Sequence, residues 1–379
     1  MNRESNCDIA VGDCLAKIAR QPKVKTTDYL ESGAFPVIDQ GTKFVGGYVN
    51  DESLLYTGPL PVVIFGDHNR HIKFVKSPFA VGADGTQLLY PDERFEISYF
   101  YYAIRALPLK NYGYERHFKY LKEERLRVWP LDVQRRIAAI LSAYDDLIEN
   151  NTRRIAILEE MARRIYEEWF VRFRFPGHEG VRMVDSELGL VPEGWRVTRF
   201  TDVFDVRYGK GLGTKDLLAD GQYPVYGAGG VIGRYDSFIA EGPTCLITSR
   251  GNGSGTVWRT VEKAFVTNNS FLVYPKADFT GLNFGFAELF AGQANVKTVV
   301  SGSAQPQLTL DGLAGLQVIA PERAVLVRFD ALVSPMFDLA NKLHFVIRNL
   351  RTTRDLLLPK LISGELDLSA VPEPEALAA

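Results

Sequence analysis

Residues 130–170 read PLDVQRRIAAILSAYDDLIENNTRRIAILEEMARRIYEEWF, and after Pro130 this stretch contains no glycine and no proline. Its apolar residues recur three and four positions apart, which places them on one face of an α-helix. Proline is favourable at a helix start because its missing N–H is not needed there, and Pro176-Gly177 ends the pattern. The stretch predicts one long amphipathic helix with a single polar seam position. The predicted seam is Ile137, Leu141, Tyr144, Ile148, Asn151, Ile155 and Leu158.

A second apolar stripe follows Pro321 and ends near Pro359, with Pro335 inside it as an expected kink or break. Two stripes in one chain most simply pack on each other, and about five heptads exceed an ordinary globular helix. We therefore predict an antiparallel coiled coil of roughly 50–60 Å at about 1.5 Å per residue. The alternative is that each helix covers its own domain. The second seam is Phe329, Leu332, Met336, Leu339, Leu343, Val346, Leu350, Thr353 and Leu357.

The remainder of the chain repeats itself at a period of about 186 residues, which is too long for a solenoid. Strand-like strings recur in the same order in both halves. The fold class predicted is therefore α+β, with two homologous mixed α/β modules joined by the two helices. The matching pairs include Phe35-Pro36-Val37 with Tyr223-Pro224-Val225, Val62-Val63-Ile64 with Cys245-Leu246-Ile247, and Leu88-Leu89-Tyr90-Pro91 with Leu272-Val273-Tyr274-Pro275.

Composition excludes several classes of protein. The net charge is −2, and no apolar run is long enough to span a bilayer. The N-terminus lacks a signal peptide, and the three cysteines show no zinc or disulfide spacing, so we expect a cytoplasmic chain with no metal and no membrane partner. The sequence contains neither a Walker phosphate loop nor a methyltransferase Asn/Asp-Pro-Pro-aromatic motif. Residues 251–255 are glycine-rich, and a hairpin turn is a better interpretation than a phosphate cradle. We therefore predict a non-catalytic protein.

The order of two modules and two helices resembles the specificity subunit of type I restriction-modification systems. The resemblance covers nearly the whole chain, and the order of its motifs, duplicated once, is specific. The strings that carry it are PLDVQRRIAAIL (130–141), DDLIENN (145–151), LVPEGW (190–195), YPVYGAGG (223–230) and LLPKLISGEL (357–366).

The resemblance implies the domains and their roles. Each module is a target-recognition domain that reads one half of a bipartite, gapped site in double-stranded DNA. The helices set the gap and dock two methyltransferase subunits and, through them, restriction subunits with motor and nuclease activity. This chain carries no cofactor, because S-adenosylmethionine belongs to the methyltransferase subunits. The implied boundaries are recognition domains at 1–129 and 177–320, helical regions at 130–176 and 321–366, and a disordered tail at 367–379.

Bulk charge does not attract DNA to either module. Residues 1–130 hold 17 Lys and Arg against 16 Asp and Glu, and residues 177–320 hold 12 against 14. DNA binding must then use local clusters or partner subunits. Arg reads guanine and Asn or Gln reads adenine, so polar turns after buried strands are the candidates. The first cluster is His68, Asn69 and Arg70, with Ser249, Arg250, Asn252 and Ser254 as its counterpart.

A second cluster lies just before the long helix of the first module and combines basic with aromatic side chains, and its counterpart in the second module offers amide side chains. A plain polar hairpin is an equally good interpretation of the first cluster, and a linker is the alternative for the second. The second cluster is Tyr114, Arg116, His117 and Lys119, with Gln305 and Gln307 as its counterpart, and the weaker candidates are Lys73, Lys210 and Arg234.

Two other functions fit the same pattern. A related system with a fused methyltransferase-nuclease would use a similar specificity subunit, and neighbouring genes would separate the two. A coiled-coil scaffold with two ligand-binding modules and no DNA role is favoured mildly by the near-zero charge.

Overall fold

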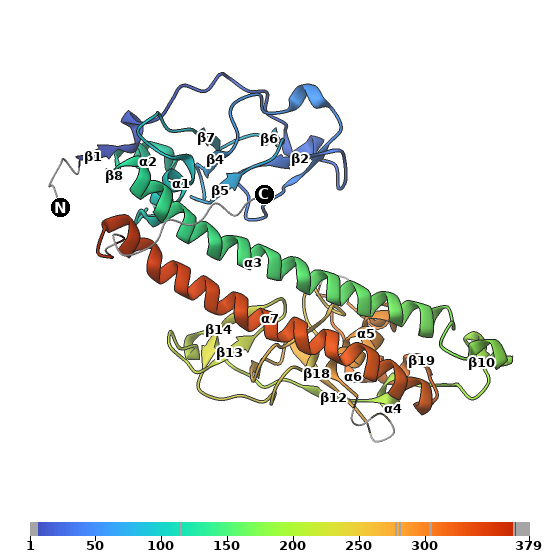
Figure 1. The fold of residues 1–379 in the computed structure, drawn as a ribbon. Helices are drawn as coiled ribbons and strands as arrows, with labels where there is room; N and C mark the ends of the chain where they lie inside the picture. Colours follow the sequence, from blue (N-terminus) through green and yellow to red (C-terminus); the bar gives the residue numbers. More distant parts are fainter. Residues whose placement is uncertain are drawn as a thin grey trace. The chain divides into compact units, whose positions relative to one another are not determined.

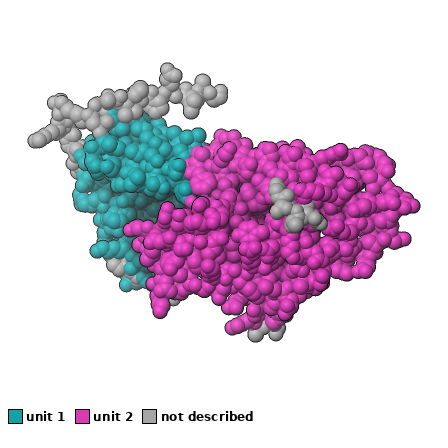
Figure 2. Space-filling view, turned by 90° about the horizontal axis from the view of Figure 1, so that it is seen from below, with its two compact units in different colours: residues 1–149, 348–379 teal, residues 150–347 magenta. Residues whose placement is uncertain are grey.

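The computed structural model describes residues 7–111, 113, 115–276, 279, 282–302, 305–366 and 368. The chain forms two compact units, which Figure 2 shows in teal and magenta: unit 1 is residues 1–149 and 348–379, and unit 2 is residues 150–347. Each unit mixes helices and strands, so the predicted α+β class is confirmed. The predicted disordered tail lies outside the described residues apart from position 368.

Among its described residues, unit 1 holds two three-stranded sheets and one two-stranded sheet (Figure 1). β4 is a run of buried residues, as expected for the central strand of a sheet. The sheets have the orders β3-β2-β6, β5-β4-β7 and β1-β8. The elements are β1 (Cys7–Ala10), β2 (Phe35–Ile38), β3 (Gly47–Val49), β4 (Val62–Gly66), β5 (Ile72–Val75), β6 (Ala80–Val81), β7 (Thr86–Leu89), β8 (Arg125–Val128), α1 (Ile97–Ala106) and α2 (Phe118–Glu123).

Unit 2 has the corresponding sheets β14-β13-β17, β16-β15-β18-β12 and β11-β19, and a hairpin of β9 and β10. The predicted duplication is confirmed, because β2 and β13 each pair antiparallel with the next strand and parallel with a later one. The elements are β9 (Met183–Ser186), β10 (Gly189–Pro192), β11 (Arg196–Arg199), α4 (Phe200–Val203), β12 (Phe204–Tyr208), β13 (Tyr223–Tyr226), β14 (Val231–Tyr235), β15 (Cys245–Thr248), β16 (Val257–Arg259), β17 (Phe265–Val266), β18 (Ser270–Pro275), α5 (Phe284–Gln293), α6 (Leu310–Gly315) and β19 (Gln317–Ala320).

The two long helices are α3 (Leu131–Tyr166), extended by a π-helical turn at Glu167–Val171, and α7 (Arg323–Ser363) (Figure 1). In unit 1 the start of α3 meets the end of α7, because Arg354 forms an ion pair with Asp145. In unit 2 the end of α3 meets the start of α7, where the Phe329 and Phe170 rings lie 4.8 Å apart. Within each unit the helices therefore run antiparallel, as the apolar stripes predicted.

The predicted seam of α7 needs two corrections. α7 continues through Pro335, so the helix is not broken there. Val346 was assigned to the seam and is 43% exposed, like Leu332 at 46% and Leu339 at 38%. The buried face of α7 is offset by about one residue from the predicted seam, because a straight helix with 3.6 residues per turn drifts away from a strict seven-residue repeat. Its buried residues are Phe329, Val333, Phe337, Ala340, Leu343 and Ile347.

The cores of the units take in the ends of the long helices. In unit 1, Ile137 and Leu141 of α3 and Leu358 and Leu361 of α7 join a core with residues of β4 and α1. In unit 2, α3 contributes Ala162 and Tyr166 to an aromatic-rich core that includes α5 and α7. Burial of these apolar surfaces is what holds each module on its helices. None of the described helices is long and apolar enough to cross a membrane.

Candidate nucleic-acid interface

In unit 1 the two candidate clusters, 44 or more residues apart along the chain, meet at Asp67. Asp67 is buried at the start of the turn that joins β4 to β5. Its carbonyl oxygen accepts a hydrogen bond from the His117 backbone N–H at 2.7 Å, and its carboxylate accepts one from the Phe118 N–H at 2.8 Å. The carboxylate also lies at the N-terminus of α2, which favours a negative charge. Asp67 therefore fastens the turn to the segment before α2.

In unit 2 the corresponding clusters also meet. Arg250 and Gln307 form an isolated antiparallel bridge, and the Gly251 N–H donates to the Pro306 carbonyl at 3.0 Å. The Ser254 hydroxyl donates to the same carbonyl at 2.8 Å. Gly251 has a φ of 87°, a conformation that favours glycine, so the turn after β15 depends on this residue. Two copies of the fold thus bring together the same two segments by different bonds.

Six of the predicted residues present exposed or partly exposed side chains that have no hydrogen-bond or ion-pair partner within the described part of the chain. The arrangement offers guanidinium, amide, imidazole and ammonium groups to a ligand, and these groups suit phosphate oxygens and base edges. The described residues contain no cluster of three or more His, Cys, Asp and Glu that could hold a metal ion. The six are His68, Arg116, Lys210, Arg250, Asn252 and Gln305.

Four predicted contacts are corrected because the structure buries their polar groups. Lys73 donates to the Lys43 carbonyl at 2.6 Å and lies 3.6 Å from Asp39. Burial lowers the pKa of the Lys73 ammonium, and Asp39 opposes this shift. His117 Nδ1 lies 3.0 Å from the Asp67 carbonyl. The other two are Ser249, whose hydroxyl donates to the Asn268 carbonyl, and Ser254.

Three other predicted residues are half-buried and shape the loops. Asn69 donates to the Gln40 carbonyl, and its own amide oxygen accepts from the His71 N–H. Arg70 has a φ of 62° and donates to the Leu109 carbonyl at 2.8 Å. Arg234 donates to two carbonyls, at Gly221 and Gln222.

The remaining predicted residues fall into three classes. Lys119 is exposed and forms an ion pair of 2.7 Å with Glu115, and hydrogen bonds from Lys119 and Tyr120 lower the pKa of that carboxyl. Gln307 is half-buried, with its backbone bonded to Ser301. Tyr114 lies outside the described residues. An ion-paired lysine can still exchange its partner for a phosphate, because an exposed pair is weak.

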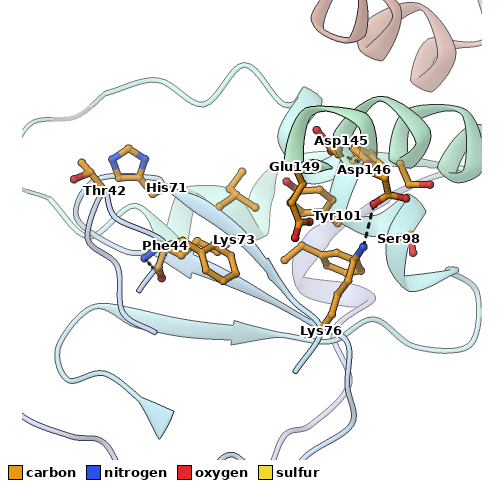
Figure 3. A pocket seen from close by; sticks show the side chains of 14 residues that line it. Thr42, Phe44, His71, Lys73, Lys76, Ser98, Tyr101, Asp145, Asp146 and Glu149 are labelled. Atoms are coloured by element: carbon orange, nitrogen blue, oxygen red, sulfur yellow. Dashed lines mark hydrogen bonds and ion pairs between the residues drawn. The ribbon is translucent and has the colours of Figure 1, made fainter. Parts of the chain in front are cut away.

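A cleft of about 440 Å³ in unit 1 separates this surface from the helices (Figure 3). Thr42, Phe44 and His71 lie at one end of it. The α3 residues Asp145, Asp146 and Glu149 line the other end, where Asp146 forms an exposed ion pair of 3.6 Å with Lys76. Asp145, beside Asp146, forms ion pairs with Arg105 and Arg354, so cations of the same unit largely neutralise these two carboxylates.

Sequence reasoning missed the loops that lie against these turns. In unit 1, the Gln40 side chain accepts a hydrogen bond from the His68 N–H at 3.1 Å. In unit 2, the Ala228 carbonyl accepts one from the Thr248 hydroxyl at 2.7 Å. The duplicated strings around 35–48 and 223–235 were the available signal, but strings rich in glycine and apolar residues did not look like sites.

Comparisons with known proteins show which family the chain resembles. Residues 192–324 match the model of the type I restriction modification DNA specificity domain. The MjaIX specificity subunit of a type I restriction enzyme, from Methanocaldococcus jannaschii, is 26% identical over 330 residues, covering 78% of this chain and 75% of that protein. Residues 192–324 thus match a type I DNA specificity domain, and most of the chain is similar to a type I specificity subunit.

Two further similarities point to the same family. The MjaVIII specificity subunit from the same organism is 26% identical over 147 residues, covering 39% of this chain and 28% of that protein. The crystal structure of a type I restriction-modification S subunit from M. genitalium superposes with a TM-score of 0.59 at 16% identity. It covers 96% of this chain and 97% of that one, so the similarity in fold extends over both modules and both long helices.

Proposed function

We propose that this chain is a type I specificity subunit that reads a bipartite, gapped site in double-stranded DNA, with one half-site bound by each unit. The duplication of the interface supports this proposal most directly. Two polar segments meet beside the same strand in both copies, at Asp67–His117 and at Arg250–Gln307. Their different side chains would select different bases, since Arg pairs with guanine and Asn or Gln with adenine.

The long helices would set the gap and dock two methyltransferase subunits, with restriction subunits joining through them. α3 is 36 residues long, which corresponds to roughly 54 Å at about 1.5 Å per residue. S-adenosylmethionine and the catalytic groups would belong to the methyltransferase subunits, which would flip out an adenine. Exposed apolar side chains on α7, including Leu332 and Leu339, are consistent with a protein partner.

The test of DNA reading is a single substitution in unit 2. Arg250→Ala should weaken specific binding by the assembled complex by about 10-fold or more, as for loss of one bidentate base contact. Arg182→Ala removes the same charge from the β9–β10 hairpin region, where Arg182 pairs with Glu193, and should leave binding unchanged. If both variants lose DNA affinity equally and for all DNA sequences, Arg250 contributes only its positive charge and does not read a base. Absence of any sequence-selective binding by the unaltered complex would favour the scaffold interpretation.

The spacer is tested by shortening both helices. Deletion of 152–158 from α3 and of 341–347 from α7 removes one heptad from each long helix. The two deleted segments face each other in the register set by the contact of Phe170 with Phe329. The helices lose roughly 10 Å, so the preferred gap should shorten by about three base pairs. A methylation map with an unchanged gap would rule out the helices as the spacer.

A further inference from the structure

In each unit large apolar side chains are exposed in or directly after a loop beside the candidate interface. Residues 39–46 join β2 to β3 in unit 1, and Phe44 in this loop is 53% exposed. Residues 227–230 join β13 to β14 in unit 2, and the first two residues of β14, Val231 and Ile232, are 57% and 46% exposed. Isolated exposed apolar side chains are ordinary on protein surfaces, so their placement has to carry the argument.

The loop of unit 1 is held in place by a buried ammonium group. Lys73 Nζ donates to the carbonyl oxygens of Lys43 at 2.6 Å and Phe44 at 3.3 Å. The same group lies 3.6 Å from the Asp39 carboxylate at the start of the loop. Because these bonds end on backbone atoms at positions 43 and 44, they orient the loop while the Phe44 ring remains outside. Figure 3 shows Phe44 with Lys73 on one side of the cleft.

The loop of unit 2 is held by two buried hydroxyl groups. Thr248 donates to the Ala228 carbonyl at 2.7 Å, and Ser270 donates to the Gly227 carbonyl at 3.0 Å. Both hydroxyl side chains are fully buried. Thr248 lies two residues before Arg250, so the loop that ends at Val231 is bonded to the strand that presents the arginine. The apolar side chains are therefore fastened to the polar surface in both units.

We infer that these loops complete each interface and that Phe44, in unit 1, and the Val231–Ile232 pair, in unit 2, contact the 5-methyl groups of thymine. This inference rests on the proposed function. The thymine methyl is the apolar group on the base edges of the major groove, and apolar side chains are its usual partners. The polar turns supply hydrogen bonds for the other bases. Continuity with those turns, through the Gln40 bonds to His68 and Asn69 in unit 1 and the Thr248 bond in unit 2, selects DNA as the occupant of the apolar loops.

The experiment uses the assembled complex after its recognition sequence has been mapped by methylation. Each thymine of the site is replaced in turn by uracil, which lacks only the 5-methyl group, and the Kd is measured for the unaltered complex, Phe44→Ala and the Val231→Ala/Ile232→Ala double variant. At one thymine in each half-site, replacement by uracil should weaken binding by the unaltered complex about fourfold. This is the factor expected for one buried methyl group. That loss should disappear with Phe44→Ala for one half-site and with the double variant for the other.

Leu188→Ala, which truncates an exposed apolar side chain outside both loops, should retain both uracil effects. The inference is overturned if no thymine couples to either variant, if the half-sites contain only G·C pairs, or if the variants lose bound methyltransferase and keep normal discrimination against uracil. In each of these cases sequence-selective binding by the unaltered complex would still support the proposed function. Loss of selective binding by the unaltered complex would instead remove the proposed function itself.

Discussion

The two units share a topology and differ in the side chains that hold it. In unit 1, Asp145 of α3 accepts a hydrogen bond from Tyr102 at 2.7 Å and forms ion pairs with Arg354 of α7 and Arg105 of α1. In unit 2, one guanidinium, Arg259 of β16, bridges Glu288 of α5 and Glu159 of α3. The first network joins two arginines to two carboxylates, since Asp355 also lies 3.7 Å from Arg105 and 2.8 Å from Arg354, and the second has one cation between two carboxylates.

The same contrast holds for the β2–β3 and β13–β14 loops, which are fastened by an ammonium group in unit 1 and by hydroxyl groups in unit 2. The backbone positions that are held correspond, although the side chains that hold them do not. Duplication has therefore kept the placement of strands and loops and left the supporting chemistry free to diverge. Each half of the interface should respond to its own set of substitutions.

The largest effect is expected where one buried cation serves two partly buried acids. Arg259→Met would leave Glu288 and Glu159 without their partner, and loss of one member of a fully buried pair costs about 3–5 kcal/mol in the free energy of unfolding. Because the two glutamate side chains are 22% and 38% exposed, we expect a cost at or below the lower end of this range. Arg105→Met, the control in unit 1, should cost less, because Asp145 keeps Arg354 and Tyr102. Urea denaturation of the full chain measures both. Partial recovery on adding Glu288→Gln to Arg259→Met would identify the unpaired charge as the cause, and equal losses in the two units would contradict the contrast.

A smaller effect is expected where α5 touches α7. A Cβ at Gly285 would lie 2.2 Å from the buried Phe337 ring, so Gly285→Ala should destabilise unit 2 by about 1–3 kcal/mol through overpacking. Gly292→Ala lies in the same helix in open space and should stabilise it by roughly 0.5–1 kcal/mol. The difference in melting temperature between the two variants measures this close contact. Similar melting temperatures would show that α5 can move away from α7.

The bonds that hold the unit 2 loop predict an effect confined to one half-site. Thr248→Val keeps the side-chain shape and removes the hydroxyl, leaving the Ala228 carbonyl without this donor at a cost of about 1 kcal/mol. Affinity should fall about fivefold, and the uracil effect in the half-site of unit 2 should vanish. The uracil effect in the half-site of unit 1 should remain. Equal changes in both half-sites would mean that the substitution acts through global stability.

The smallest effect is a pH dependence restricted to unit 1. Burial gives the Lys73 ammonium a lower pKa in the folded chain than its ordinary 10.5, with Asp39 as the charge that faces it. Burying the charged form costs stability below the folded pKa, and this cost disappears as the pH rises toward 10.5. The free energy of unfolding relative to Lys73→Met should therefore rise as the pH passes the lowered folded pKa and approaches 10.5. If the difference in the free energy of unfolding between the two proteins does not change with pH, the charge of Asp39 fully offsets the cost of burying the Lys73 ammonium.

Sequence reasoning succeeded where the structural signal is local and periodic. The stripe from Ile137 to Leu158 predicted α3, and the paired strings at 35–37 and 223–225 predicted the homologous sheets. It was less successful along α7, where a heptad count through Pro335 assigned Val346 to the seam and missed Ile347. Both choices have similar three- and four-residue spacings, and the decision depends on which residues of other elements pack against the helix.

By itself, the amino-acid sequence determined the two long helices, the duplication and the polar segments from which the interface is built, because periodicity and motif order are properties of the chain. Only the tertiary structure decided which polar residues face a ligand. Lys73 and Arg250 are both cations close behind buried strands, yet Lys73 is enclosed by a loop about 30 residues earlier in the chain and Arg250 is left exposed. Burial depends on segments that are distant in sequence, and so does the division of these residues between those that hold loops and those that remain available to a ligand.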